Sequence, residues 1–522
     1  MTVLHMSDYA DERDDRVSHR YAADRPDLAI DAMMCAVAPD PGVYQRSGRL
    51  VHLSVEMAQG LATSSPTIRD MTGANLRDRA SSLFVAERES PKGWVAGRIP
   101  DEVISGALDR GRYHGVRPIS GVIETPSITR GGEVMPPGYD AATGLVYVPS
   151  GTIDEMPDRP TQGDACFAVS ELAEVFRDFP FASLHHAAAA VASLLTLFAR
   201  PAIDGPVPLM MIEASTRGTG KSRMIDAIAN IAVGRDAAKR TYSLDAEEMR
   251  KSYTSAVMAG RTMLVLDNIA RVIGDATLDS LLTSCVYDDR QLGKNADVNL
   301  RHWLTIFASA NNPSYAGDTA RRTLPIRLES RLENPEDRQD FRHPDLLGWV
   351  RKERPRLMRA ALIVLRAWYV AGCPDMGCRV WGSFERWSSV IPHAIMHAGM
   401  VDPMLAREGI ESEADPARCA LGVLIEGWGM MDGAGYGLTV SQVMRSLYPA
   451  KSGWDQPPPD PPYYDSMRDA LMELAPPRSG ERPEARAVGI VMRRARARVV
   501  GGRMVVGDGT THGSARWRVV GV

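Results

Sequence analysis

The sequence predicts an α/β protein built around a parallel sheet, with further domains on both sides of that core. Between residues 206 and about 330, short apolar runs alternate with helical patterns, which is typical of strands joined by crossover helices. A glycine-rich loop follows the first of these runs, and the chain closes with helices followed by a strand pair. With 522 residues, 44% of them apolar and 24% charged, the chain has room for roughly three or four globular domains.

The pattern changes along the chain and marks its expected divisions. Short alternating runs and turn-rich pieces fill the first part, and helical periodicity is strong at 183–198 and again at 346–369. We therefore expect five regions: an α+β N-terminal region at 1–165, a helical collar or linker at 166–205, the α/β core at 206–335, a helical lid region at 336–435 and a winged helix at 436–522.

Composition indicates the compartment. The formal net charge is only −4, so any nucleic-acid interface must be a local cluster of charge. Six scattered cysteines favour a reducing compartment, and Cys373 and Cys378 do not have the spacing of a common zinc site. The polar first 20 residues predict no signal peptide, and no apolar run reaches the length of a membrane span. We expect a cytoplasmic protein with no membrane partner.

The glycine-rich loop has the layout of a phosphate-binding loop. An apolar run at 207–212 leads into Glu213-Ala-Ser-Thr-Arg-Gly-Thr-Gly-Lys-Ser222, and a helical pattern at 223–231 follows. In such a loop the backbone N–H groups turn toward phosphate oxygens, here through Thr216, Arg217, Gly218, Thr219 and Gly220. Lys221 would reach the β- and γ-phosphates, and Ser222 would hold Mg²⁺. Ser215 stands where the first glycine of this pattern is usual.

A carboxylate ends the next apolar strand. The strand at 263–266 is followed by Asp267 and Asn268, 46 residues after Lys221. Carboxylate and hydroxyl oxygens suit Mg²⁺, so we expect Asp267 to complete a magnesium site beside the loop. The alternative is an ordinary polar residue at the end of a strand.

An amide ends the third strand. The run at 303–310 closes with Asn311, Asn312 and Pro313. An amide at this edge can orient an attacking water and sense the γ-phosphate. Asn311 fits this role best, Asn312 comes next, and a plain turn is the alternative.

An arginine pair follows about ten residues later. Arg321 and Arg322 precede an apolar run at 324–328 whose Pro325 favours an edge strand. One of the two arginines would reach the γ-phosphate held by a neighbouring subunit. A solvated basic pair is the alternative, and the sequence does not choose between the two residues.

A basic hairpin is expected between the second and third strands. Residues 290–302 have the pattern strand, turn, strand, with Lys294 near the tip. A lysine there would contact the backbone of single-stranded DNA in a ring channel. A surface hairpin with a solvated lysine fits the sequence as well.

The order of these motifs resembles the superfamily 3 helicases of the AAA+ class. It is most similar to the primase-helicases of bacterial prophages and plasmids. The resemblance is strong over 206–330 and extends to 123–130, 137–144 and 382–388. It implies an AAA+ core that binds ATP and Mg²⁺, forms a hexameric ring and translocates on single-stranded DNA at a fork. No primase signature stands in the N-terminal region, so any primase would be a separate partner.

One departure from the family bears on catalysis. Asn268 follows Asp267 where many AAA+ proteins have a catalytic glutamate, and an amide cannot take up a proton. Asp267 itself and Glu213, at the mouth of the loop, are the two candidates for the general base.

The C-terminal region is locally basic. Three helical patterns, at 440–447, 466–474 and 484–498, precede two alternating runs around a turn at 507–510, which is the pattern of a winged helix. We expect its last helix to lie in the major groove and its wing to lie against the backbone. The residues expected to contact DNA are Arg486, Arg493, Arg494 and Arg503. A winged helix that binds protein is the alternative.

Two other functions fit the same motifs. The first is an AAA+ initiator or loader that remodels origin DNA without processive unwinding. The second is a DNA-binding regulator gated by nucleotide, which Asn268 favours because slow hydrolysis suits a switch.

Overall fold

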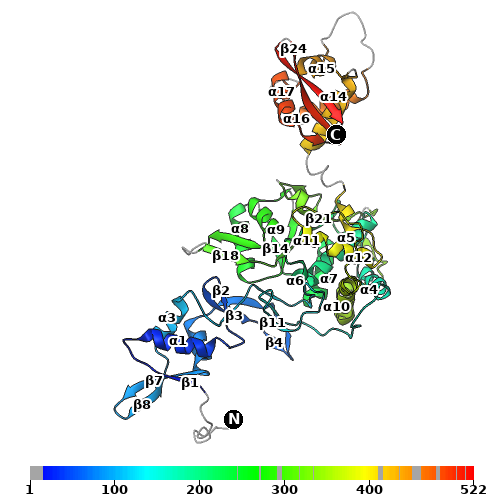
Figure 1. The fold of residues 1–522 in the computed structure, drawn as a ribbon. Coiled ribbons are helices and arrows are strands. Elements are labelled where there is room, and N and C mark those ends of the chain that lie inside the picture. Colours follow the sequence, from blue (N-terminus) through cyan, green and yellow to red (C-terminus); the bar gives the residue numbers. More distant parts are fainter. Residues whose placement is uncertain are drawn as a thin grey trace, which may run out of the picture. The chain divides into compact units, whose positions relative to one another are not determined.

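The structure is a computed structural model of the chain. It describes residues 16–243, 245–269, 272–290, 297–316, 318–332, 334–408, 416–433, 435–449, 460–477, 482–500, 502–511 and 513–521. The chain forms two compact units, Met1–Arg407 and Glu408–Val522, each of which is described by itself (Figure 1). The sequence had placed the last division at 435/436 instead.

A five-stranded parallel sheet forms the centre of the first unit, as the sequence predicted. Its strands in spatial order are β14 Lys239–Thr241, β15 Met263–Ile269, β19 Thr305–Asn311, β13 Leu209–Ala214 and β21 Thr323–Leu328. The strand that ends near Asp267 is therefore not the neighbour of the phosphate-loop strand, because β19 lies between them. β21 is an edge strand, in agreement with its Pro325.

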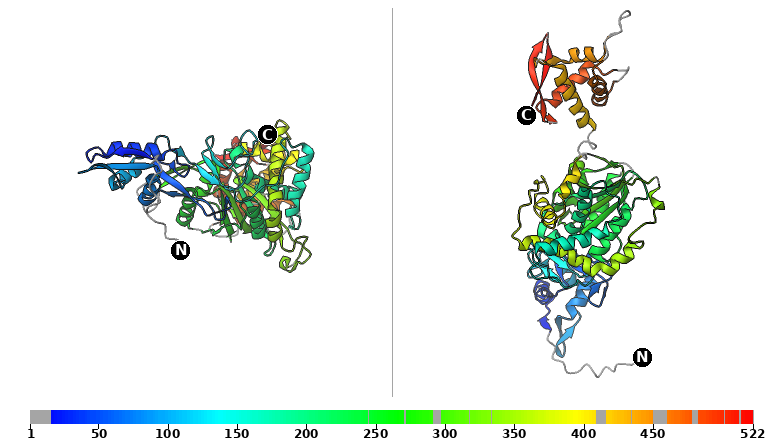
Figure 2. Two further views of the ribbon diagram at one scale, coloured as in Figure 1. Left: turned by 90° about the horizontal axis from the view of Figure 1, so that it is seen from below. Right: turned by 90° about the vertical axis from the view of Figure 1, so that its right-hand side faces the viewer.

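Each face of this sheet is covered by its own set of helices. Along β13, Met210 and Ile212 pack with α4 Gln162–Val175, α5 Leu184–Phe198, α7 Lys221–Val233 and α10 Leu346–Val370. Leu209 and Met211 pack on the opposite face with α8 Ala246–Met258 and α9 Ala276–Thr283. This alternation is the period of two that a strand buried on both faces must show. Both views in Figure 2 show the green strands lying among these helices.

The rest of the core connects these layers. Its remaining elements are α6 Arg200–Ile203, β16 Val272–Ile273, β17 Val286–Arg290, β18 Asp297–Arg301, β20 Ser314–Tyr315, η2 Ala320–Arg322, η3 Pro335–Asp337, α11 Glu385–Ser388, α12 Ile391–His397 and η4 Pro403–Arg407. β17 and β18 pair antiparallel and form the expected hairpin.

From residue 16 onward, small sheets and three helices form the N-terminal region. They are β1 Val17–Arg20, α1 Pro26–Val37, β2 Tyr44–Arg46, β3 Arg49–Ser54, β4 Met57–Ala58, β5 Leu61–Ala62, β6 Thr67–Asp70, α2 Gly73–Ser81, β7 Phe84–Ser90, β8 Gly93–Gly97, α3 Asp101–Asp109, β9 Arg117–Pro118, β10 Gly121–Ile123, β11 Gly138–Asp140 and β12 Leu145–Tyr147. Arg46 joins this region to the core, since its guanidinium donates to the carbonyls of Met258 at 2.7 Å and Val257 at 3.0 Å, at the end of α8. A cation there complements the helix dipole.

The second unit has helices packed on a four-stranded sheet. Its elements are α14 Pro416–Met431, β22 Leu438–Thr439, α15 Val440–Leu447, α16 Tyr463–Leu474, α17 Ala485–Ala495, β23 Val499–Val500, β24 Arg503–Thr511 and β25 Ser514–Gly521. α14 was expected in the lid region, but Leu424 and Trp428 on this helix are fully buried against the second unit's own core. The hairpin turn also differs from expectation, because β24 passes through a bulge between Gly507 and Thr510 and turns only after Thr511. No helix in the described ranges has the length and apolar character that crossing a membrane requires.

Candidate functional site

The loop between β13 and α7 has the backbone that phosphate binding needs. Gly218 and Gly220 have φ of 76° and 91°, and Gly220 is the N-cap of α7. These left-handed turns direct backbone N–H groups inward at a helix start, where the dipole favours an anion. Ser215 is not among the residues with positive φ, so this position does not require a glycine. The buried hydroxyl of Thr216 has no hydrogen-bond partner in the described part of the chain, which suits a donor to phosphate.

Lys221 and Asn311 meet at the edge of the sheet. The Lys221 ammonium donates to Asn311 Oδ1 at 2.7 Å and to the Thr216 carbonyl at 3.5 Å. Burial lowers the pKa of Lys221, and the nearby Asp267 charge opposes this shift. The ammonium is thus held between the phosphate loop and the carboxyl end of β19. Asn312 instead donates to the Ser215 carbonyl at 3.4 Å.

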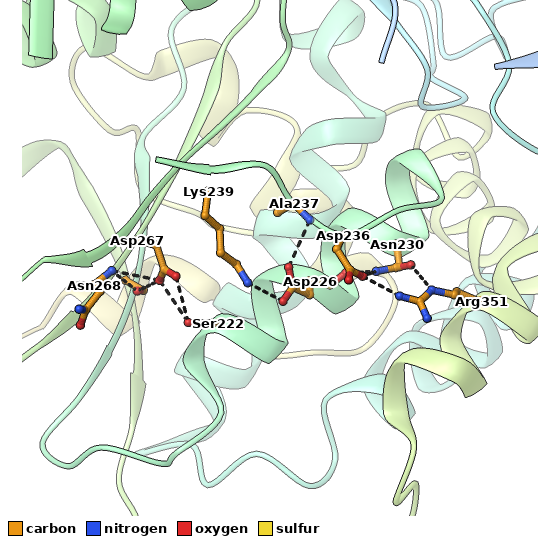
Figure 3. A network of polar contacts seen from close by, with 10 residues as sticks. Ser222, Asp226, Asn230, Asp236, Ala237, Lys239, Asp267, Asn268 and Arg351 are labelled. Atoms are coloured by element: carbon orange, nitrogen blue, oxygen red, sulfur yellow. Dashed lines mark hydrogen bonds and ion pairs between the residues drawn. The ribbon is translucent and has the colours of Figure 1, made fainter. Parts of the chain in front are cut away.

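Ser222 and Asp267 form a pair of oxygen ligands. The Ser222 hydroxyl lies 3.1 Å and 3.4 Å from the two Asp267 carboxylate oxygens, and Figure 3 shows the two side chains facing each other at the start of α7. A hydroxyl and a carboxylate at this spacing fit Mg²⁺, which keeps several waters and takes few protein ligands. The residues present therefore fit the expected ion.

Ser309 positions Asp267 and was missed in the sequence. Its buried hydroxyl on β19 donates to Asp267 Oδ1 and accepts from the Asn268 N–H at 3.0 Å. Asn268 has φ of 54° and lies in a bulge of β15 between Leu266 and Ile269. The signal was present, because Ser309 is two residues before Asn311 and so lies on the same face of its strand.

Glu213 is directed away from these residues. Strand alternation places it with Met211, on the face covered by α8 and α9, and it is buried. Its carboxylate accepts from Arg327 Nε at 2.8 Å and from the Tyr315 hydroxyl at 3.2 Å. A carboxylate that is ion-paired with arginine is a weak base. This position argues against Glu213 as the general base.

The two arginines of η2 have different surroundings. The Arg322 side chain is 12% exposed and lies 2.8 Å from Asp279 and 3.3 Å from Asp318. The Arg321 side chain is 60% exposed, with Asp318 at 2.6 Å. Arg322 is thus held inside its own subunit, whereas Arg321 faces solvent.

Lys294 lies outside the described residues, so only the root of its hairpin is described. Arg301, at the end of β18, is ion-paired with Asp204 and lies 4.5 Å over the Trp303 ring. His302 follows, with Nε2 at 2.8 Å from the Ser284 carbonyl. These contacts fasten the root of the hairpin to Asp204 on one side and to Ser284 on the other.

A cavity of about 490 Å³ opens beside the phosphate loop. It reaches Gly218 and Gly220, and its other walls include Phe179, Phe341 and His343. Sequence reasoning missed this cavity because its walls come from two segments about 160 residues apart that only the fold brings together. The segment at 338–343 is fastened to the other wall, since the Arg342 N–H donates to Asp178 at 2.9 Å.

The basic residues of the second unit separate into two groups. Arg486, Arg493 and Arg494 lie exposed on α17. Arg503 lies at the end of β24 remote from the hairpin turn, where it pairs with Glu426 on α14 at 3.0 Å. The structure thus does not bring Arg503 to the tip of the wing.

Comparisons with known proteins give distant structural similarities. No family model and no curated protein matches the chain. "The A form apo structure of NrS-1 C terminal region-CTR" has a TM-score of 0.42 and 12% identity, over 92% of this chain and 96% of that one. A second structure of that region, "CTR(305-718)", has a TM-score of 0.37 and 11% identity over 72% and 80%. "SCCmec type IV Cch - active helicase" has a TM-score of 0.30 and 13% identity over 84% and 95%.

Proposed function

We propose that this chain is an ATP-driven DNA helicase that assembles as a hexameric ring and serves the replication of a prophage or other mobile element. The observation that supports this most is the meeting of Lys221, Ser222, Asp267 and Asn311 at the carboxyl edge of the parallel sheet. Ligands of open α/β sheets bind at this edge.

The phosphate loop and the adjoining cavity would together hold the nucleotide. The backbone of Thr216 to Gly220 and the Lys221 ammonium would bind the β- and γ-phosphates. The Phe179 ring lies close to Gly220, so that a Cβ added at Gly220 would lie 3.0 Å from the ring. The aromatic and apolar walls suit a nucleobase, so the cavity of about 490 Å³ is the place for the adenine.

The same residues account for the chemistry of hydrolysis. Mg²⁺ held by Ser222 and Asp267 would neutralise charge on the phosphates. The Asn311 amide would orient the attacking water, and Ser309 would keep Asp267 in position through its hydrogen bond. Of the two candidates for the general base, Asp267 stays beside the phosphate loop, whereas Glu213 is ion-paired with Arg327.

Contact between subunits and with DNA completes the proposal. Arg321 would act on the γ-phosphate of a neighbouring subunit, because it is the exposed member of its pair. Lys294 would grip single-stranded DNA in the channel. In the second unit, α15, α16 and α17 with β22, β24 and β25 follow the order of a winged helix, which would bind duplex DNA at a fork.

Hydrolysis and strand displacement test the proposal together. Full-length chain with forked DNA should hydrolyse ATP and separate the strands. Lys221→Ala and Asp267→Asn should each lower hydrolysis at least about a hundredfold, since each removes a group that stabilises the developing charge. Lys251→Ala is the matched control, because Lys251 pairs with Glu247 and Glu248 on the surface of α8. A folded chain that releases no phosphate on any DNA contradicts the proposal.

A nucleotide-gated initiator or regulator is the second candidate. Asn268 supplies an amide where a base is usual, and the Glu213 carboxylate is neutralised by Arg327. Both features favour slow hydrolysis, which suits a switch. ATP-dependent binding of duplex DNA without strand displacement would support this second function and exclude the first.

A further inference from the structure

Three exposed arginines of the Glu408–Val522 unit lie on α17, and further exposed arginines are Arg482 and Arg496 beside it and Arg445 on α15. Arg486, Arg493 and Arg494 are exposed on α17, and no carboxylate in the described residues is ion-paired with them. Two arginines of the strand pair are engaged instead, whereas Arg518 is half-buried and has no ion pair in the described residues. Arg516 donates from Nε to the Asp508 carbonyl at 2.9 Å and pairs with its carboxylate at 3.5 Å. Arg503 pairs with Glu426.

A glycine lies between two of the α17 arginines. The buried side of α17 is formed by Val488, Met492 and Ala495. Gly489 is partly exposed and lies at the edge of the exposed side, three residues after Arg486 and four before Arg493, so it is a neighbour of both arginines. A Cβ at Gly489 would meet no atom within 4 Å. Glycine weakens a helix relative to alanine, and packing within the unit gives no reason for it here.

We propose that this unit docks on duplex DNA through the exposed face of α17, with Gly489 at the point of closest approach, and without the β24–β25 turn. This rests on the proposed function of the unit in DNA binding. The absent side chain lets the DNA backbone approach the helix, and Arg486 and Arg493 bind phosphates on either side of it. Arg493 already folds over the glycine, with Nε donating to the Gly489 carbonyl at 3.2 Å.

DNA fits this face better than an acidic protein segment does. Guanidinium groups pair with phosphate and with carboxylate alike through two parallel N–H groups, so the apolar content of the face decides between the two partners. The face offers only one exposed large apolar side chain among the described residues of α17, Ile490, and a protein interface usually has an apolar centre. An extended row of phosphates needs no such centre.

Two glycine substitutions in the full-length chain test the proposal. Gly489→Ala is the probe and Gly507→Ala is the matched control. Gly507 lies on β24, an added Cβ there would also meet no atom within 4 Å, and neither glycine has a positive φ. Binding is measured by fluorescence anisotropy with a labelled blunt duplex and no nucleotide, at several salt concentrations. Gly489→Ala should bind about fivefold or more weakly, because the added methyl prevents close approach. Its melting temperature should stay the same or rise.

The control variants define the outcome. Gly507→Ala should stay within about twofold of the unaltered chain. Arg486→Ala should reduce the slope of log affinity against log salt by about 0.9, whereas Arg516→Ala should leave it unchanged. The proposal is overturned if Gly489→Ala binds the duplex as tightly as the unaltered chain does. It is also overturned if Gly507→Ala and Arg516→Ala lose as much duplex affinity as Gly489→Ala. If the unaltered chain binds no duplex, DNA binding by this unit fails as a whole. An acidic peptide that binds the unaltered chain more tightly than the duplex does, and that Arg486→Ala binds more weakly, would overturn the proposal and indicate a protein partner instead.

Discussion

At the scale of single residues, four side chains that the sequence singled out meet in the structure because each ends a strand or starts a helix. Lys221 and Ser222 begin α7, Asp267 lies near the end of β15, and Asn311 ends β19. The carboxyl ends of parallel strands share one edge, so these positions meet without detailed knowledge of packing. Ser309 was missed although its spacing from Asn311 placed it on the same face, whereas the ion pair of Glu213 with Arg327 required the structure because the two residues are 114 positions apart in the sequence.

Substituting each arginine of η2 in turn should show that Arg321 affects ATP hydrolysis, whereas Arg322 affects the stability of the fold. Arg321→Ala removes an exposed side chain and should cost under about 1 kcal/mol of unfolding free energy. It should lower ATP hydrolysis by about a thousandfold if Arg321 acts on the γ-phosphate held by a neighbouring subunit. Arg322→Ala removes the arginine that is ion-paired with Asp279, which keeps its hydrogen bond from Thr319, and should cost about 1–3 kcal/mol. Steady-state hydrolysis and thermal melting of both variants measure the two effects.

Mixing subunits shows whether Arg321 acts on a neighbour. Arg321→Ala and Lys221→Ala chains should each be inactive alone, but a mixed ring would contain interfaces with both groups intact. Partial recovery of hydrolysis on mixing is expected. Arg321→Ala subunits that assemble and hydrolyse ATP at the rate of the unaltered chain would exclude this role.

At the scale of elements, the sequence predicted the strands and helices of the core well but not their arrangement. β13, β15, β19 and β21 are short apolar runs with polar ends, a local signal. That β19 lies between β13 and β15 depends on pairing over about 100 residues. The turn of the C-terminal hairpin was placed too early for a related reason, because the bulge between Gly507 and Thr510 continues the strand through residues that favour turns.

The root of the β17–β18 hairpin should weaken in acid. Burial lowers the pKa of His302 to about 4, and the charge of Arg200 adds to this. Between pH 6.5 and 4 the unfolded chain binds a proton at this histidine that the folded chain does not, so stability falls as the pH falls. From pH 7 to pH 5 this loss is about 2 kcal/mol.

His302→Gln isolates that contribution, because glutamine has no titratable group. The unaltered chain should lose more of its melting temperature between pH 7 and pH 5 than this variant does. Parallel losses in the two proteins would show that other groups control the acid response.

At the scale of the whole molecule, the division into units places the whole candidate site in the first unit. The residues that form the site and its cavity lie between Asp178 and Leu346. η4 Pro403–Arg407 ends the first unit, and Arg407 still contacts it by donating to the Arg321 carbonyl at 3.1 Å. α14, by contrast, has its buried residues in the core of the second unit.

Two truncated chains test this division. A chain that ends at Arg407 should keep the basal ATP hydrolysis of the full chain and lose duplex binding. A chain that ends at Gly435, the limit that the sequence favoured, exposes the apolar face of α14, including Leu424, Ile425 and Trp428, and should aggregate. Light scattering measures the aggregation of the two chains, and phosphate release measures their ATP hydrolysis. As a control, Asp267→Asn in the chain that ends at Arg407 must abolish its hydrolysis. If the chain ending at Arg407 melts normally but hydrolyses nothing, the second unit supplies part of the active site. If the chain ending at Gly435 is the more soluble of the two, α14 belongs with the first unit.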